Sequence, residues 1–220
     1  MTKRKLALSR RRMIQAGLAG GALALTGMLG GRQGLAAARL APTPTQSLGP
    51  FYPDTLPAEY DNDLVRVAEG SDAAGQVVHV LGTVRGTDGE AIPGARVEIW
   101  QCDADGLYHH PRQRGAADPA FQGYGVTPSG LDGAYRFRTI HPVPYTGRTP
   151  HIHVMVSAPG MRRLVTQLYV EGAPGNERDF LFSRLAPEQQ AMLLVRFAPA
   201  PEIEPNALAG TFDIVVEPEG

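Results

Sequence analysis

The chain has 220 residues, 43% of them hydrophobic, with 26 glycines and 19 prolines, which suits one soluble domain with a sizeable core. Its net charge of -1 hides an asymmetry: residues 1–38 carry seven basic residues and no acid, leaving 14 basic residues, all arginine, against 22 acids in residues 39–220. This acidic remainder argues against nucleic acid or an anionic membrane surface as a partner. The single cysteine, Cys102, excludes an intrachain disulfide and a closed thiolate metal site.

Residues 1–38 have the order of an export signal, with basic residues first, then an apolar run at 16–30, then small residues. The motif Arg10-Arg11-Arg12 resembles a twin-arginine signal. The alternative is an uncleaved membrane anchor, although a span needs roughly 20 apolar residues. We therefore predict a twin-arginine-type signal peptide at 1–38 and a mature domain at 39–220. The mature protein would be periplasmic or extracellular, with no membrane contact after cleavage.

Beyond the signal, the pattern predicts an extended arm followed by short strands. Residues 42–57 are rich in proline, glycine and aromatic residues, as an arm would be. Residues 95–100 alternate with period two, which places Ala95, Val97 and Ile99 on one face of a strand. Turn dipeptides separate this run from the strand before it. The other predicted strands lie at residues 77–84, 135–138, 151–156, 164–170 and 212–216.

Only one helix is predicted, at residues 187–196, with proline in its first turn. Many short strands with glycine and proline turns and hardly any helix indicate an all-β fold. We expect an antiparallel β-sandwich with long active-site loops and little helix. The connection at residues 103–133 is the longest and is a natural place for function.

The strongest local signal for chemistry is the pair His151 and His153, which surrounds Ile152 in a predicted strand. Side chains at i and i+2 of a strand point to the same face, so both imidazoles converge. Two such histidines can act as two metal ligands on a stiff support. A solvated or hydrogen-bonded pair is the alternative at this stage.

Two tyrosines could complete a metal site. Tyr145 lies six residues before His151, and Tyr108 follows the strand that ends at Trp100. Tyrosinate is a hard oxygen donor that favours a hard ion such as Fe(III), and two tyrosinates with one hydroxide balance a 3+ charge. Ionising tyrosine near pH 7 costs roughly 4 kcal/mol, which the metal would have to offset. From the residues alone, either tyrosine is far more often a packed aromatic side chain than a metal ligand.

Several motifs, in the same order along the chain, resemble the intradiol ring-cleavage dioxygenases, the family of protocatechuate 3,4-dioxygenase and catechol 1,2-dioxygenase. The resemblance covers residues 43–185. The matching stretches are TQSLGPFY at 45–52, GARVEIWQ at 94–101, Gly106-Leu107-Tyr108, YRFRTI at 135–140, RTPHIH at 148–153 and TQLY at 166–169.

This resemblance implies a non-haem Fe(III) enzyme that uses O2 to open a catechol ring between its hydroxyl-bearing carbons, forming a cis,cis-muconate-type diacid. Its metal ligands would be Tyr108, Tyr145, His151 and His153, with Tyr145 and His153 axial. Tyr145 would also act in catalysis by leaving the iron when substrate binds. By the same resemblance, Arg148 would steady negative charge on the substrate ring, whereas a surface ion pair is the alternative role.

The remaining implications concern oxygen, substrate and assembly. Gln167 matches a polar residue on the oxygen-binding side of the pocket. The short interval between Tyr145 and His151 resembles that of exported family members and predicts an open pocket mouth. The absence of a helical N-terminal dimerisation domain is more typical of the protocatechuate type. The partners implied are a catechol substrate and O2, and relatives commonly form homo-oligomers.

Two other functions are consistent with parts of the sequence. Residues 82–95 also resemble transthyretin-like and carboxypeptidase-regulatory domains, which are non-catalytic β-sandwich binding modules without a metal. A different metal site is the second alternative, in which zinc or copper would be held with the help of His109 or His110. Stoichiometric iron in the purified protein would distinguish the intradiol dioxygenase from both of these alternatives.

Overall fold

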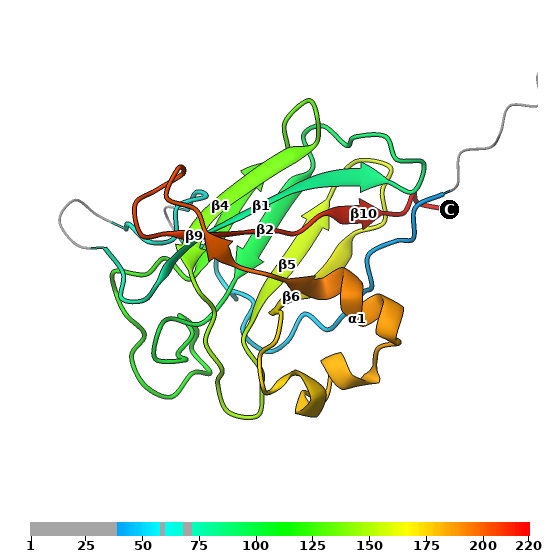
Figure 1. Ribbon diagram of the computed structural model, residues 1–220. Coiled ribbons are helices and arrows are strands. Elements are labelled where there is room, and N and C mark those ends of the chain that lie inside the picture. Colours follow the sequence, from blue (N-terminus) through cyan, green and yellow to red (C-terminus); the bar gives the residue numbers. More distant parts are fainter. Residues whose placement is uncertain (1–38, 58–59, 68–71) are drawn as a thin grey trace, which may run out of the picture. The chain divides into compact units, whose positions relative to one another are not determined.

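The computed structural model describes residues 39–57, 60–67 and 72–220, which form two β-sheets with one short helix (Figure 1). The predicted signal at 1–38 lies outside the described residues. One sheet contains β1 (Val77–Gly86), β4 (Ala134–Ile140), β8 (Ala198–Pro199), β9 (Leu208–Thr211) and β10 (Ile214–Val216). The other has the order β3 (Tyr124–Pro128), β2 (Arg96–Trp100), β5 (His151–Ser157), β6 (Leu164–Val170) and β7 (Leu194–Val195). Two 3-10 turns, Asn176–Arg178 and Phe182–Arg184, precede α1 (Pro187–Leu193).

The main core is built from alternate residues of both sheets. In β2, Val97 and Ile99 are fully buried, and in β5 the residues Ile152, Val154 and Val156 are at most 1% exposed. They join Val80 of β1, Phe137 of β4 and Ile214 of β10 in one apolar cluster. Each such side chain contributes about 1.5–3 kcal/mol by burial. Because the inward residues of β2 and β5 fill this core, the intervening residues are free to build a site on the other face.

The predicted all-β sandwich is confirmed, with two mixed sheets in place of purely antiparallel ones. Strand β1 pairs in parallel with β9 and β10, and β6 pairs in parallel with β7. The predicted helix ends at Leu193, since the next two residues form β7 alongside β6. The final strand, predicted at 212–216, begins two residues later as β10, because Phe212 and Asp213 separate it from β9. The Asp213 carboxylate accepts hydrogen bonds from the backbone and hydroxyl of Thr83, so it interrupts the regular pairing.

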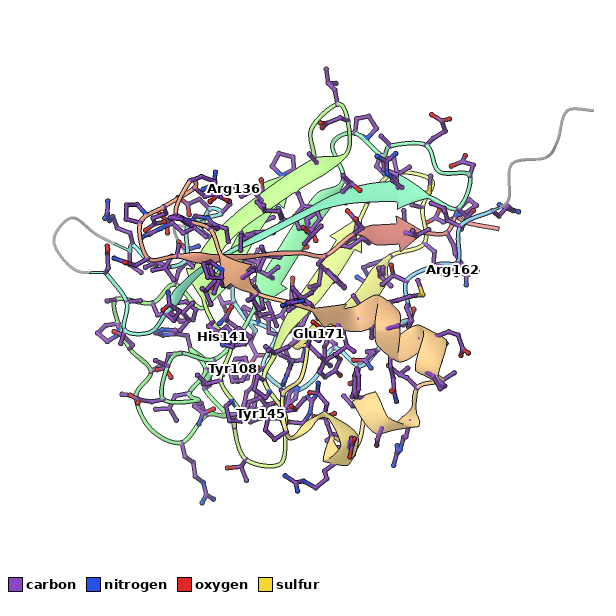
Figure 2. The ribbon with its side chains drawn as sticks, viewed as in Figure 1. Tyr108, Arg136, His141, Tyr145, Arg162 and Glu171 are labelled. Carbon is purple, nitrogen blue, oxygen red and sulfur yellow. The ribbon has the colours of Figure 1, made fainter. Side chains whose placement is uncertain are left out.

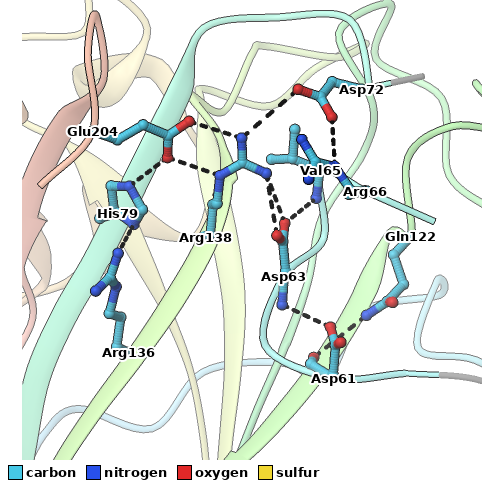
Figure 3. A network of polar contacts seen from close by, with 10 residues as sticks. All are labelled: Asp61, Asp63, Val65, Arg66, Asp72, His79, Gln122, Arg136, Arg138 and Glu204. Carbon is cyan, nitrogen blue, oxygen red and sulfur yellow. Dashed lines mark hydrogen bonds and ion pairs between the residues drawn. The ribbon is translucent and has the colours of Figure 1, made fainter. Parts of the chain in front are cut away.

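A polar network joins the first sheet to two loops (Figure 3). Arg138 of β4 donates to both oxygens of Glu204 at 2.8 Å and to Asp63 at 3.0 Å. His79 of β1 is buried and places Nε2 2.9 Å from Glu204, while its Nδ1 lies 3.1 Å from the Arg136 guanidinium. These contacts hold the segments around Asp63 and Glu204 against the sheet.

The one α-helix has a limited structural role. It has seven residues, begins with Pro187 as the sequence predicts, and buries Leu193. Across the described parts of the chain, we find no helix with the length and apolar character required to cross a membrane.

Candidate metal centre

The outer face of the second sheet carries a row of side chains at one level. Strand register places Tyr124 opposite Trp100, Trp100 opposite His153, and His153 opposite Gln167. The next row holds His151 opposite Tyr169. Residues opposite one another in register point to the same face, so four strands contribute side chains to one surface. This surface is buried because the arm and the long loops cover it, and both histidines are only 1% exposed.

The two histidines converge as the i, i+2 spacing predicts. The Nε2 atoms of His151 and His153 are 3.3 Å apart. The His151 Nδ1–H donates a hydrogen bond of 2.7 Å to the Thr149 carbonyl oxygen, so the lone pair lies on Nε2. Burial first, and then the Arg148 charge, lowers the pKa of His151 to about 4; burial and His151 lower the pKa of His153 further. Both imidazoles are therefore neutral near pH 7, as metal ligands must be.

Two loops bring the tyrosines to these histidines, and Figure 2 labels Tyr108 and Tyr145 close to one another. Tyr108 comes from the connection between β2 and β3, and Tyr145 from the connection between β4 and β5. Their ring centroids are 5.4 Å apart, Tyr145 is 5.4 Å from His151, and Tyr108 is 6.3 Å from His153. Gly106, at a φ of 79°, makes the close approach possible, because a Cβ there would lie 3.3 Å from the Tyr145 Cβ.

The Tyr108 hydroxyl is buried and has no hydrogen-bond partner among the described residues. Burial, followed by the neighbouring Tyr145, raises the pKa of Tyr108 well above its ordinary value. Burying a phenol without a hydrogen-bond partner costs free energy. The Tyr108 oxygen is therefore placed to bind an acceptor or a cation. By contrast, Tyr145 is only half-buried, although burial also raises its pKa.

These four donors fit a ferric ion. They comprise two neutral nitrogens and two phenol oxygens, a set of hard and intermediate donors that suits Fe(III). The described residues contain no group of three or more His, Cys, Asp and Glu that could hold a metal, so a metal here would draw on the phenolates. The histidines of the zinc or copper alternative each have one ring nitrogen in a contact within their own loop, whereas the buried His110 Nε2 has no hydrogen-bond partner among the described residues and lies 3.4 Å from Asp54 Oδ2. His109 Nε2 lies 2.9 Å from the Asp118 carbonyl, and His110 Nδ1 accepts from the Arg112 backbone at 3.1 Å.

Arg148 and Gln167 lie beside the histidines and contact one another. The Arg148 guanidinium donates to Asp179 Oδ2 at 2.7 Å and to Gln167 Oε1 at 2.6 Å, and its Nη1 lies 3.4 Å from His151 Nε2. With a side-chain exposure of 7% against 0% for Asp179, this is a buried ion pair rather than the surface pair considered as an alternative. The pair keeps a positive charge fixed next to the proposed metal ligands.

The sequence reasoning missed Asp179. Besides Arg148, its carboxylate accepts hydrogen bonds from the backbone of Thr149, Leu181 and Phe182. These bonds outweigh the effect of burial, and the pKa of Asp179 is lowered. The only local signal was an aspartate immediately before the apolar run 180–182. Asp179 therefore anchors both Arg148 and the chain beyond β6.

The contacts of the arm were also missed. Phe51 stacks on Tyr108 with ring centroids 4.5 Å apart, and Gln46 accepts a hydrogen bond of 2.6 Å from the Tyr169 hydroxyl. Gly49, at a φ of 75°, leaves room for His153, because a Cβ there would lie 3.1 Å from the His153 ring. Of the core residues, Trp100 stacks on His153 at 4.8 Å with the rings 8° from parallel. The arm is therefore one wall of the site.

The chain resembles known proteins over the region that builds this site. A family model described as dioxygenase matches residues 48–218. Hydroxyquinol 1,2-dioxygenase from Corynebacterium glutamicum is 37% identical over 145 residues, covering 57% of this chain and 45% of the relative. Catechol 1,2-dioxygenase 1 from Acinetobacter lwoffii is 32% identical over 159 residues, covering 64% and 50%. The chain thus spans about half the length of the curated relatives it matches.

A solved structure covers more of the chain. The dioxygenase domain of a dioxygenase carbohydrate-binding protein fusion from Streptomyces sp. SirexAA-E superimposes with a TM-score of 0.63 at 34% identity. The match covers 81% of this chain and 100% of that domain. The family model and this structural match together show that the chain belongs to the dioxygenase family, in agreement with the intradiol resemblance carried by its motifs.

Proposed function

We propose that this chain is a non-haem iron(III) intradiol dioxygenase that uses O2 to open a catechol-type ring between its two hydroxyl-bearing carbons. The product would be a cis,cis-muconate-type diacid. The observation that carries the proposal is the convergence of Tyr108, Tyr145, His151 and His153, in which the buried Tyr108 hydroxyl has no hydrogen-bond partner among the residues that the structure describes. The names of the similar relatives, hydroxyquinol and catechol 1,2-dioxygenases, support the same reaction class.

The protein side chains would have separate roles in this reaction. Bound iron(III) would supply Lewis acidity and a docking point for both catechol oxygens. Tyr108 is the more deeply buried phenol and stays in place, whereas Tyr145 sits half-buried on a turn closed by the Arg148 backbone, where it can move and take a catechol proton at Oη. Arg148 holds its positive charge towards the ring because Asp179 and Gln167 fix two sides of its guanidinium.

The substrate and the cellular location belong to the same proposal at a finer level. The relatives' names favour hydroxyquinol or catechol as the substrate, and a protocatechuate-like or otherwise substituted catechol is the other candidate. The basic and apolar pattern of residues 1–38 supports an export signal, with 39–220 as the mature domain in the periplasm or outside the cell.

The test uses the mature protein, reconstituted with iron in air. We expect one iron per chain, a visible tyrosinate-to-iron absorption band, and oxygen uptake with at least one of catechol, hydroxyquinol and protocatechuate. With ¹⁸O₂, the ring-opened product should carry both labelled oxygen atoms. A colourless, iron-free protein that binds catechols without oxygen uptake would instead support the non-catalytic binding module.

A further inference from the structure

A continuous line of aromatic side chains leads from the proposed metal centre to the surface. Trp100 lies against His153 with centroids 4.8 Å apart, and Tyr52 meets the edge of Trp100 at 5.0 Å. Tyr124 follows at 6.2 Å from Tyr52, and Tyr60 at 5.6 Å from Tyr124. Trp100 and Tyr124 are at most 2% exposed, whereas Tyr60 is 36% exposed. Electrons transfer rapidly between aromatic rings in such contact, so the line has the geometry of a redox path.

One carboxylate serves the two inner phenols of this line. Glu98 Oε2 accepts hydrogen bonds from the hydroxyls of Tyr52, at 3.0 Å, and Tyr124. Its other oxygen accepts a hydrogen bond from Arg96 Nε at 3.0 Å, which pairs the carboxylate with a guanidinium. Oxidising a tyrosine releases its phenol proton, and Glu98 is placed to receive it.

Trp100 differs from the tyrosines in its proton chemistry. Its indole Nε1 is buried and has no hydrogen-bond partner among the described residues. An oxidised Trp100 therefore has no group to take its proton and stays a cation, which a neighbouring tyrosine with a proton acceptor can readily reduce. The arrangement thus favours movement of the electron vacancy outward, from Trp100 towards the phenols.

We propose that Trp100, Tyr52, Tyr124 and Tyr60 form an electron-transfer chain that carries oxidising equivalents away from the metal centre. This inference rests on the proposed function, because the oxidant would arise where iron held by this site, in its ferrous form, gives one electron to hydrogen peroxide. The O–O bond would then break to give hydroxide and a hydroxyl-radical-class oxidant. A hydroxyl-radical-class oxidant takes one electron from Trp100 and becomes hydroxide. Tyr52 returns that electron to Trp100 and passes its proton to Glu98.

The remaining steps move the vacancy to solvent. Tyr124 reduces Tyr52, which recovers its proton from Glu98, and Tyr124 gives its own proton to the same carboxylate. Tyr60 then reduces Tyr124, which recovers that proton, and Tyr60 releases its proton to water. A free catechol finally restores Tyr60 by donating a hydrogen atom and becomes a semiquinone. Each electron moved in this way prevents one oxidation of a side chain at the metal centre.

The experiment reduces the iron of the iron-loaded protein to Fe(II), adds hydrogen peroxide in the presence of a nitroso spin trap, and maps the adducts by peptide mass spectrometry. The adduct should lie on Tyr60, and freeze-quench electron paramagnetic resonance should show a tyrosyl radical. Tyr124→Phe keeps the ring but removes the phenol proton, so most of the Tyr60 adduct should be lost and labelling should move to Trp100 or Tyr52. Tyr60→Phe, at an exposed position, should move the label to Tyr124.

The matched control is Tyr135→Phe, the same substitution at a buried tyrosine that is not part of the proposed electron-transfer chain. The Tyr135 hydroxyl donates a hydrogen bond to the backbone oxygen of Phe212. It should leave the Tyr60 adduct unchanged. Iron content and the visible band are measured before peroxide is added. Protein that takes up no iron overturns this inference together with the proposed function. If the protein is coloured and iron-loaded but Tyr60 carries no adduct, the electron-transfer proposal alone is overturned. The same holds if Tyr60 is labelled equally in Tyr124→Phe or in the iron-free protein.

Discussion

Replacing Asp179 by asparagine tests how the buried ion pair supports the site. The carboxylate is fully buried, receives the Arg148 Nε at 2.7 Å, and also accepts three backbone N–H groups. Asparagine keeps the size but leaves the Arg148 charge without its partner. Breaking a buried pair in this way costs about 3–5 kcal/mol. At roughly 2–4 °C per kcal/mol for a domain of this size, Tm should fall by about 6–20 °C.

The assay is thermal unfolding of the iron-free mature protein, with Glu217→Gln as the matched control. Glu217 pairs with Arg162 at 3.3 Å, but their side chains are 44% and 67% exposed, so its loss should cost about 0–1 kcal/mol. Oxygen uptake by iron-loaded Asp179→Asn should fall even at a temperature where it is fully folded, because Arg148 is no longer held. Equal Tm changes in the two variants would refute the argument that burial makes the Asp179 pair important.

Three further predictions follow from individual contacts. Tyr108→Phe should remove most of the visible tyrosinate-to-iron absorption and most turnover, and an unchanged spectrum and rate would contradict its assignment as a ligand. Gly49→Ala should destabilise the chain by about 1–2 kcal/mol, because its φ of 75° is left-handed and the new Cβ would crowd the His153 ring at 3.1 Å; denaturant unfolding and iron-binding titration measure the two effects. Hydrogen bonding from Arg138 lowers the pKa of Glu204 from 4.5 to about 2, so this carboxylate stabilises the fold above pH 4.5 and the gain disappears as pH falls towards 2. Glu204→Gln should therefore lower the free energy of unfolding by about 1–2 kcal/mol in urea at pH 7. If the difference between the wild-type protein and the variant is no smaller at pH 3, this linkage is contradicted.

Local pattern determined most of the strands and the convergence of the two histidines. Period-two alternation places Val97 and Ile99 towards the core and His151 and His153 away from it, and both placements depend only on strand geometry. Neither β3 nor β9 was predicted from the sequence. Strand β9 is short and gains its place from the parallel pairing with β1, a contact between distant parts of the chain.

The tyrosines show where pattern reached its limit. Their residue type suggested hard donors, but only the motif resemblance selected Tyr108 and Tyr145 from the seven tyrosines of the chain. The structure brings both to the histidines, while their role as iron ligands stays a prediction. Spacing could not show this meeting, because the two loops approach one another through Gly106, a long-range contact.

Strand periodicity and contiguous motifs are local properties, so the all-β class, the family resemblance and the face on which the histidines lie could be predicted from them. The cover that the arm forms over the site, the hold of Asp179 on Arg148 and the aromatic line from His153 to Tyr60 are visible only in the folded chain. Each of these depends on residues far apart in the chain. Such contacts form when the two sheets bury their shared core and the loops are drawn together over the opposite face.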